Sequence, residues 1–309
     1  MVSIKILMSR VTNKQTQQTS DGGVLYVVAT PIGNPDDISA RAIRTLKDAD
    51  LIACEDTRRT GQMLASHQIA TPTISYFEHN EERRVPEMIE RMVAGAQIAL
   101  VTDAGTPAIS DPGFRLVRAS LDAGIRVVAV PGASAAIAAL SVAGLPTDRF
   151  TFEGFLPTRD GVRRRALDAL RAESRTMVFY EAARRLADTI AAMIAAFGDS
   201  RSAAVVREIS KTYEETVRGT LLDLERRFRA TPALGEITII VAGAENATAA
   251  VSDGAPITIE VPIAVEALRE AGLSLKQASA VVAKLSGRAR REVYQDVLKS
   301  REDDDSTDD

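Results

Sequence analysis

Near-continuous apolar runs alternate with amphipathic stretches along residues 24–143, and this alternation constrains the fold more than any other feature of the chain. The runs are VLYVVA, DLIAC, TISYF, QIALVT and RVVAV, and such continuous hydrophobicity is typical of parallel strands buried on both faces. The stretches DISARAIRTLKDA, EERRVPEMIERMVAG and PGFRLVRASLDAG have helical periodicity, and the last two end in Gly, as a helix C-cap does. We therefore predict a doubly wound α/β domain over residues 24–145.

The pattern changes after residue 145 and predicts a second α/β domain over residues 146–245 with a more mixed sheet. Its strands are FTFEGF, RTMVFYE, SAAVVRE and EITIIVAG, and its helices are expected at about 160–172, 182–196 and 220–229. The remaining segments are a disordered leader (1–23), a linker rich in Ala, Gly, Asp and Pro (246–261), a unit of short helices with helix-turn-helix spacing (262–300) and an unstructured acidic tail (301–309).

Composition restricts the class of protein. The single cysteine, Cys54, excludes an intrachain disulfide and favours a reducing, cytoplasmic setting. No run approaches the roughly 18 apolar residues of a membrane span. The acidic tail holds six carboxylates and one arginine, so the other 300 residues carry a net charge of +1 although the whole chain carries −4. Residues 1–300 are therefore not acidic overall, and their clustered basic residues could bind an anionic partner.

Three loops follow predicted parallel strands and are rich in small residues: ATPIGNPDD, TDAGTPAISDPG and PGASAA. In an open parallel sheet, ligands bind beyond the carboxyl ends of the strands, and small residues let a ligand approach the backbone closely. None of the loops matches a dinucleotide fingerprint or a phosphate-binding loop, and the two histidines predict no metal site. Any one loop alone also fits a tight turn, but three at one edge favour a ligand. Within the second loop, Asp111 precedes a predicted helix and is expected to be its N-cap.

The motifs LYVVATPIGN, EDTRRTG, TDAGTPAISDPG, VPGASAA, FEGFLP, FYEA and REISKTYEE occur in the order in which they occur in the tetrapyrrole methylase superfamily, which the chain resembles. Within it they are similar to the ribosomal RNA small subunit methyltransferase I group. The resemblance implies two α/β domains with a cofactor cleft between them, a homodimer, and methyl transfer from S-adenosylmethionine to the 2′-hydroxyl of a cytidine in 16S rRNA, with the free RNA or the 30S subunit as partner. It also implies the cofactor-binding residues, which are Ile32, Gly33, Asp103, Ala104, Gly105, Thr106, Ile109, Ser134, Ala135, Tyr180 or Glu181, and Ile209.

Methyl transfer requires an aligned ribose oxygen and is helped by a base or by a cation near the developing alkoxide. We expect Glu55 or Asp56 to be the base, Arg58 to contact phosphate or alkoxide, and Lys211 to lower the effective pKa of the hydroxyl or contact RNA. The alternatives are a helix N-cap at Asp56 or Thr57 with a surface ion pair, and, for Lys211, an exposed lysine at a strand end.

Basic clusters favour RNA over a small-molecule substrate, although a charge run also fits a solvated helix face. Few aromatic residues favour recognition of a folded RNA shape over extended base stacking. A tetrapyrrole C-methyltransferase and a non-catalytic RNA-binding assembly factor remain alternatives. The expected RNA-binding residues are Arg59, His79, Arg163, Arg164, Arg165, Lys284, Arg288, Arg290 and Arg291.

Overall fold

The first sheet is parallel throughout and has the strand order β3-β2-β4-β1-β5. This computed structural model describes residues 22–244, 261–270, 272–286 and 290–305. The central strand β1 pairs with β4 on one side and with β5 on the other. The strands are β1 (Val24–Val28), β2 (Leu51–Cys54), β3 (Thr73–Ser75), β4 (Gln97–Leu100) and β5 (Arg126–Val130).

Helices cover both faces of the first sheet, as the continuous apolar runs predict. One buried cluster joins α1 and α2 to one face, and a second joins α3 and α4 to the other. Ser39 caps α1 by accepting the amide hydrogen of Ala42. The helices are α1 (Ala40–Asp48), α2 (Thr57–Ser66), α3 (Glu81–Val93) and α4 (Phe114–Asp122), with a short 3-10 turn, η1, at Pro35–Asp37.

The second sheet has the order β6-β7-β10-β8-β9 and is mixed, because only β6 and β7 are parallel while the other pairs are antiparallel. The strands are β6 (Phe150–Phe155), β7 (Thr176–Ala182), β8 (Ser202–Arg207), β9 (Glu215–Thr220) and β10 (Glu236–Val241). The prediction of two α/β domains with a more mixed second sheet is therefore confirmed.

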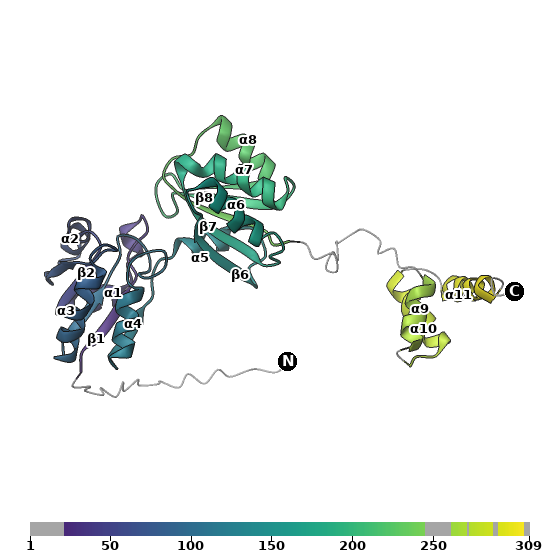
Figure 1. Cartoon of the computed structure of the whole chain (residues 1–309), viewed down its shortest axis with the longest axis horizontal. Helices are drawn as coiled ribbons and strands as arrows, with labels where there is room; N and C mark the ends of the chain where they lie inside the picture. The colour runs from purple at the N-terminus through teal and green to yellow at the C-terminus, as the bar shows by residue number, and fades with distance from the viewer. Residues whose placement is uncertain (1–21, 245–260, 271, 287–289, 306–309) are drawn as a thin grey trace, which may run out of the picture. The chain divides into compact units, whose positions relative to one another are not determined.

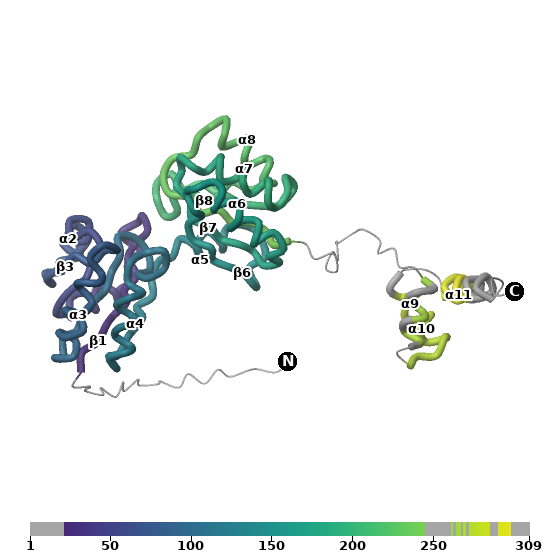
Figure 2. Tube along the Cα trace, in the orientation of Figure 1, coloured from purple at the N-terminus to yellow at the C-terminus, as the bar shows by residue number. Residues whose placement is uncertain are grey.

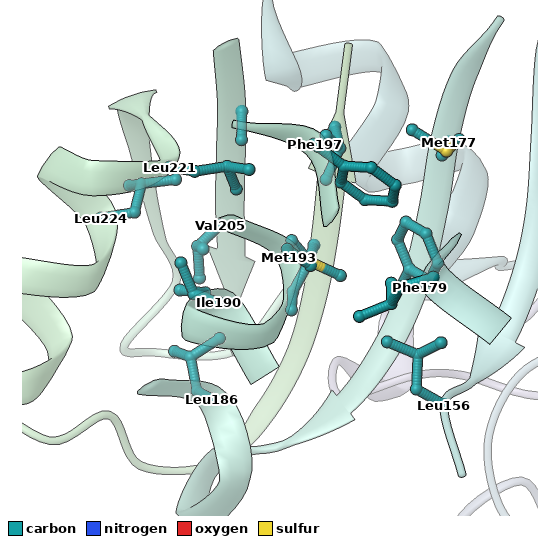
Figure 3. Close-up of a cluster of buried hydrophobic side chains, with 14 of the residues drawn as sticks. Leu156, Met177, Phe179, Leu186, Ile190, Met193, Phe197, Val205, Leu221 and Leu224 are labelled. Atoms are coloured by element: carbon teal, nitrogen blue, oxygen red, sulfur yellow. The ribbon is translucent and has the colours of Figure 1, made fainter. Parts of the chain in front are cut away.

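Three helices pack on one face of the second sheet: α6 (Asp160–Ala169), α7 (Leu186–Phe197) and α8 (Leu221–Ala230). A short turn, η2 (Ala183–Arg185), leads from β7 into α7. Figure 3 shows Met193 of α7 beside Phe179 of β7 in this core, and Ile190 of the same helix beside Val205 of β8. All four side chains are fully buried. Burial of apolar surface contributes roughly 25 cal/mol per Å², so this packing stabilises the second α/β domain.

Helix α5 (Ala135–Ala143) follows β5 of the first sheet but packs on the other face of the second sheet (Figures 1 and 2). Its apolar residues Ala136, Leu140 and Ala143 contact the cluster of β7, β8 and β10. The boundary that we predict at residue 145 thus falls after a helix that belongs, by its packing, to the second sheet. The sequence pattern cannot show this, because the helix is apolar around its whole circumference.

The C-terminal helices form a separate compact unit with its own core. They are α9 (Val261–Glu270), α10 (Leu275–Ser286) and α11 (Arg290–Asp305). Val265, Val282 and Val293, one from each helix, are fully or almost fully buried. Helix α11 extends to Asp305, into the segment for which we predict an unstructured tail. The predicted leader up to residue 21, the linker over residues 246–260 and the end of the tail lie outside the described residues.

The sequence prediction lacks α5 and β9, and it includes α2 only through the alternative of an N-cap at Asp56. The α2 segment is polar and follows a strand directly, so its few apolar residues give a weak helical signal. Strand β9 (ETVRGT) has charged and half-buried positions and lies at the sheet edge, where hydrophobic patterning is weak. The long polar segment between β8 and α8 therefore reads as a loop.

Candidate functional site

The loops after β1 and β4 are joined to each other at the carboxyl edge of the first sheet. Thr30 and Gly105 exchange backbone hydrogen bonds of 2.9 and 3.2 Å, and the hydroxyl of Thr30 donates to the Thr102 carbonyl at 3.0 Å. Thr30 is 2% exposed. Gly105 has a φ of 86°, a conformation that glycine adopts without strain. Two of the three predicted ligand loops are thus one rigid structure.

The carboxylate of Asp56 caps the N-terminus of α2. Its carboxylate accepts hydrogen bonds from the backbone amides of Arg58 (2.8 Å) and Arg59 (3.4 Å) and from the Arg58 guanidinium (3.0 Å). The hydrogen bond from the Arg58 side chain, helped by the backbone amides, lowers the pKa of Asp56 to about 2. Such a carboxylate is a weak base, so the N-cap alternative describes this residue. The Arg58 side chain is 88% exposed, which leaves it available to an external phosphate.

Asp103 also faces α2. One carboxylate oxygen accepts the Asp56 amide at 3.2 Å, and the other accepts the Arg59 guanidinium at 2.9 Å. The Asp103 side chain is 19% exposed, so it is largely enclosed by these contacts. Asp103 therefore fixes α2 to the loop after β4, and Arg59, expected to bind RNA, is bound to it.

A second group of carboxylates lies beside this contact. Glu55 accepts a hydrogen bond from the Thr102 hydroxyl at 3.2 Å. Burial, together with the negative charges of Glu55 and Asp103, raises the pKa of Asp111 to about 6, while a hydrogen bond with Thr102 opposes the shift. Asp111 is half-buried. A carboxylate that titrates near neutral pH is suited to accept a proton.

The N-cap expected at Asp111 is wrong. Helix α4 begins at Phe114, and its N-cap is Gly113, whose amide donates to buried Glu81 at 3.0 Å. The backbone of Gly113 has a φ of 139°, and Asp111 precedes this N-cap by two residues. Ala108 and Ser110 also have positive φ values, 68° and 62°, in the same loop. Non-glycine residues in this region are strained, and such strain concentrates at functional sites.

A pocket of about 410 Å³ lies between the loop after β1, the start of α5 and the loop after β8. Pockets of roughly 300–1,000 Å³ accommodate small ligands. Three of the predicted cofactor residues line it: Ile32, Ser134 and Ile209. The other lining residues are Asp37, Ala133, Ala138, Ser141, Val142, Ser210 and Glu214. The sequence prediction does not include these seven residues, because their proximity depends on how α5 and the loop after β8 fold together.

Tyr180 lies near this pocket, and Glu181 does not. The phenolic oxygen of Tyr180 accepts the amide hydrogen of Ala136, in the first turn of α5, at 3.1 Å. Glu181 points to the opposite face of the sheet, where it is 3% exposed and accepts the Thr189 hydroxyl at 2.6 Å. Successive strand residues face opposite sides, so only one of the pair can face α5. Glu181 is a buried structural carboxylate beneath α7.

Lys211 lies against the first loop. A Cβ at Gly33 would be 2.4 Å from Cγ of Lys211, so only glycine permits this approach. The Lys211 ammonium donates to Glu208 at 2.9 Å and to Glu236 at 3.1 Å. Partial burial lowers the pKa of Lys211, but these carboxylate partners outweigh it and raise the pKa overall. The space beside Gly33 therefore holds a cationic side chain.

The remaining predicted cofactor residues lie at the same edge outside the pocket lining. Thr106 donates its hydroxyl to the Ala133 carbonyl at 3.4 Å, which connects the loops after β4 and β5. Ile109 is 49% exposed, an apolar side chain that the fold leaves uncovered. Ala104 lies in the loop after β4 and Ala135 begins α5, and both are partly exposed.

The expected RNA-binding residues do not all reach the surface. Arg163 is 9% exposed and its guanidinium pairs with Asp160 at 2.7 Å, so it stabilises α6 and is not presented to RNA. Its helical position faces the core together with Leu167. The exposed members within the described residues are Arg59, His79, Arg164, Arg165, Lys284, Arg290 and Arg291, while Arg288 lies outside those residues.

Two absences concern only the described ranges. There, no group of three or more His, Cys, Asp and Glu side chains is arranged to hold a metal ion. Nor does any helix within those ranges combine the length and apolar character needed to cross a membrane.

Models of two known families match the chain. The tetrapyrrole (corrin/porphyrin) methylases match residues 24–225, and the RsmI C-terminal HTH domain matches residues 263–301. Ribosomal RNA small subunit methyltransferase I from Synechocystis sp. is 45% identical over 88% of this chain and 96% of its own length. The protein of the same name from Escherichia coli O157:H7 is 41% identical over 93% of this chain and 99% of its own length.

Solved structures show the same fold in more distant proteins. A uroporphyrin-III-C-methyltransferase from Thermus thermophilus has a TM-score of 0.52 and 20% identity, covering 71% of this chain and 94% of that one. A diphthine synthase has a TM-score of 0.52 and 15% identity, covering 71% of this chain and 90% of that one. A complex of uroporphyrin-III C-methyltransferase with S-adenosyl homocysteine has a TM-score of 0.50 and 21% identity, covering 71% and 97%.

Proposed function

Because the chain belongs to the ribosomal RNA small subunit methyltransferase I family of tetrapyrrole methylases, we propose that it methylates the ribose 2′-hydroxyl of a cytidine in 16S rRNA, using S-adenosylmethionine. The identity of 45% across nearly the whole of a relative with that name carries the proposal. Family membership supports the coarser activity, which is methyl transfer to ribosomal RNA. The nucleoside, the ribose oxygen and the cofactor are the proposed specifics.

The pocket beside α5 suits a ligand with adenosine and amino-acid parts. Small side chains and hydroxyls, such as Ala133, Ser134 and Ser141, line it and leave the backbone accessible. The carboxylates of Asp37 and Glu214 at its wall offer acceptors for an ammonium group. When bound, the sulfonium cofactor supplies an activated methyl group. We therefore propose Ile32, Ser134 and Ile209 as cofactor contacts, with Asp37 and Glu214 added to the predicted set.

Proton acceptance is proposed for Glu55 and Asp111 rather than for Asp56. The ribose oxygen forms a bond to the methyl carbon as the carbon–sulfur bond breaks, and the hydroxyl proton passes to a carboxylate. Asp56 is excluded because its oxygens are bound by the α2 amides and by Arg58. Glu55 accepts the Thr102 hydroxyl, Asp111 also interacts with Thr102, and both carboxylates lie at the same carboxyl edge as the proposed cofactor loops.

Positive charge near the acceptor oxygen is proposed to come from Arg58 and Lys211. Arg58 is held at the helix start by Asp56 and extends into solvent, where it can contact an RNA phosphate. Lys211 is protonated and lies against Gly33 of the first loop. Its role is therefore that of a fixed cation rather than a base.

The decisive experiment offers radiolabelled S-adenosylmethionine together with 30S subunits, naked 16S rRNA or uroporphyrinogen. Label in RNA, mapped by mass spectrometry to one 2′-O-methylcytidine, supports the proposal. Label in uroporphyrinogen would support the tetrapyrrole alternative, and cofactor binding without transfer to any substrate would support an assembly factor. The first two arms also distinguish the assembled subunit from free RNA as substrate.

The family resemblance also extends the proposal to a cytoplasmic homodimer. Sedimentation equilibrium of the full-length chain tests the oligomeric state, with a dimer mass as the expected result. Fractionation of cells, with the protein recovered beside ribosomal subunits, tests the compartment.

A further inference from the structure

A pocket in the C-terminal unit lies where the first turns of α10 and α11 meet. Its volume is about 680 Å³. Three of the lining side chains are exposed cations, and the lining includes no carboxylate among the described residues. The lining residues are Ser274, Leu275, Lys276, Arg290, Arg291 and Tyr294.

The placement of these cations is unfavourable for the helices themselves. A helix N-terminus carries partial positive charge, so acidic side chains stabilise it and basic ones do not. Lys276 lies in the first turn of α10, which holds no acidic residue, and Arg290 and Arg291 begin α11. The single acidic residue in the first turn of α11, Glu292, does not line the pocket. A local conflict of this kind indicates selection for something other than stability, and a bound anion would relieve it.

Hydrogen bonds organise the pocket wall. Ser274 and Gln277 form reciprocal capping contacts, in which the Ser274 hydroxyl donates to the Gln277 side chain at 2.7 Å and accepts its amide at 3.4 Å. This cap does not use the amides of Leu275 and Lys276, which lie at the helix end. Arg290 donates one N–H to the Lys276 carbonyl at 2.9 Å, which fixes its guanidinium against α10. Its remaining donors are suited to two oxygens of one phosphate.

An aromatic ring completes the set of groups. Tyr294 is 40% exposed and follows Arg290 and Arg291 by one helical turn, so the three side chains share one face of α11. Exposed aromatic rings stack on unpaired bases, and guanidinium groups bind the adjoining phosphates. Cations, helix ends and a ring together match a nucleotide of a flexible strand better than an isolated phosphate.

We propose that this pocket binds a phosphodiester and the adjacent unpaired base of a ribosomal RNA strand. The choice of RNA rests on the proposed function, whereas the anionic and aromatic chemistry rests on the pocket alone. The pocket is a second RNA contact, separate in sequence from the loops of the methyl-transfer site, and it is expected to raise affinity without taking part in the reaction.

Fluorescence anisotropy of the full-length protein with a short labelled single-stranded RNA tests the site. Lys276→Gln combined with Arg291→Gln is expected to weaken binding at least about tenfold and to reduce the slope of log affinity against log salt by about 2. Tyr294→Leu is expected to weaken binding about tenfold, whereas Tyr294→Phe retains the ring and the affinity. Lys47→Gln removes one exposed charge from α1 and is expected to change neither quantity.

Methyl transfer to 16S rRNA separates failure of this inference from failure of the proposed function. The pocket variants are expected to raise KM for rRNA and leave kcat unchanged. Wild-type protein that transfers no methyl group to rRNA overturns the proposed function, whatever the binding result. Active wild-type protein, with unaltered affinity and salt slope in the charge variant, overturns the pocket. The charge substitutions lie on exposed side chains, so they decide the question even where Tyr294→Leu lowers the Tm.

Discussion

The phenolic oxygen of Tyr180 accepts the backbone amide hydrogen of Ala136 at 3.1 Å, so a strand of the second sheet holds the first turn of α5 beside the proposed cofactor pocket. Tyr180→Phe removes the acceptor and is expected to destabilise the protein by about 1 kcal/mol. It is also expected to weaken S-adenosylhomocysteine binding several-fold, measured by calorimetry. Tyr26→Phe, which removes a contact to Gln97 in the first sheet, is the control and leaves ligand affinity unchanged. Equal ligand affinity in the two variants would show that the hydrogen bond of Tyr180 does not affect ligand binding in the pocket.

The pH dependence of methyl transfer is expected to follow Asp111. The pKa of this carboxyl is raised to about 6, and a base must be deprotonated to act, so activity rises with pH through about 6 and then reaches a plateau. Asp111→Asn is expected to lower kcat by roughly 10²- to 10⁴-fold and remove that limb. A single-turnover pH profile measures both effects. An unchanged profile in Asp111→Asn assigns the titration to another group.

Stability provides an independent reading of the same carboxyl. A raised pKa means that the folded state binds the proton more tightly, so this stabilisation is present below the unfolded pKa near 4 and is lost as pH rises through about 6. Asp111→Asn is therefore expected to stabilise the protein at pH 8 by on the order of 1–2 kcal/mol relative to the wild type. The difference disappears at acidic pH. Urea denaturation at both pH values measures it, and a destabilised variant at pH 8 contradicts the burial of this group.

Substitution of Asp56 is expected to lower the stability of the protein, whereas substitution of Glu55 is expected to lower its activity. Asp56→Ala removes the cap of α2 and is expected to lower the free energy of unfolding by about 0.5–2 kcal/mol. Glu55→Gln keeps the size of the side chain and is expected to reduce methyl transfer while the protein unfolds as the wild type does. Denaturant titration and single-turnover kinetics of both variants test the pair. Asp56→Asn preserves the cap, and a complete loss of transfer in that variant would return the role of base to Asp56.

Gly33 is expected to be intolerant of a methyl group because Lys211 occupies the space. Gly33→Ala is expected to destabilise the protein by about 1–3 kcal/mol, and shortening the neighbour in the double variant with Lys211→Ala recovers part of that loss. Gly61→Ala is the matched control, because a Cβ there meets nothing within 4 Å and lies in a helix. It is expected to stabilise by about 0.5–1 kcal/mol. Additive effects at Gly33 and Lys211 would show that the two do not contact.

Substitutions of the buried and the exposed arginines of α6 are expected to have different effects on stability and on RNA binding. Arg163→Ala leaves a gap beside Leu167 and removes the partner of Asp160, so a lower Tm is expected. Arg164→Ala removes an exposed charge and is expected to leave Tm unchanged while it weakens RNA binding and lowers the salt slope by about 1. Thermal unfolding and anisotropy measure the two effects. A reversed result would contradict the orientation of the helix.

The apolar runs were sufficient to predict every strand of the first sheet. The pattern is clearest for β1, β2 and β4, which are largely buried, whereas the edge strands β3 and β5 are only partly buried. The same logic could not assign α5, whose uniformly apolar sequence does not say which sheet it covers. It also could not choose between Tyr180 and Glu181. Strand alternation places the two side chains on opposite faces of the sheet, but it does not say which of them is on the face that α5 covers. Asp111 was misassigned because its neighbours Pro112 and Gly113 suggest a helix start there, whereas the N-cap of α4 is Gly113, two residues further along the chain.

Helix α5 has a consequence for any attempt to divide this protein. It is joined to the first sheet by the chain and to the second by its packing, so a fragment that starts at residue 146 would present one bare apolar face of its sheet to water. A fragment that ends at residue 145 would carry an apolar helix without its partner surface. The two α/β halves therefore depend on one shared helix. A duplication, recombination or circular permutation that preserves folding has to retain α5 packed on the second sheet and joined to the first.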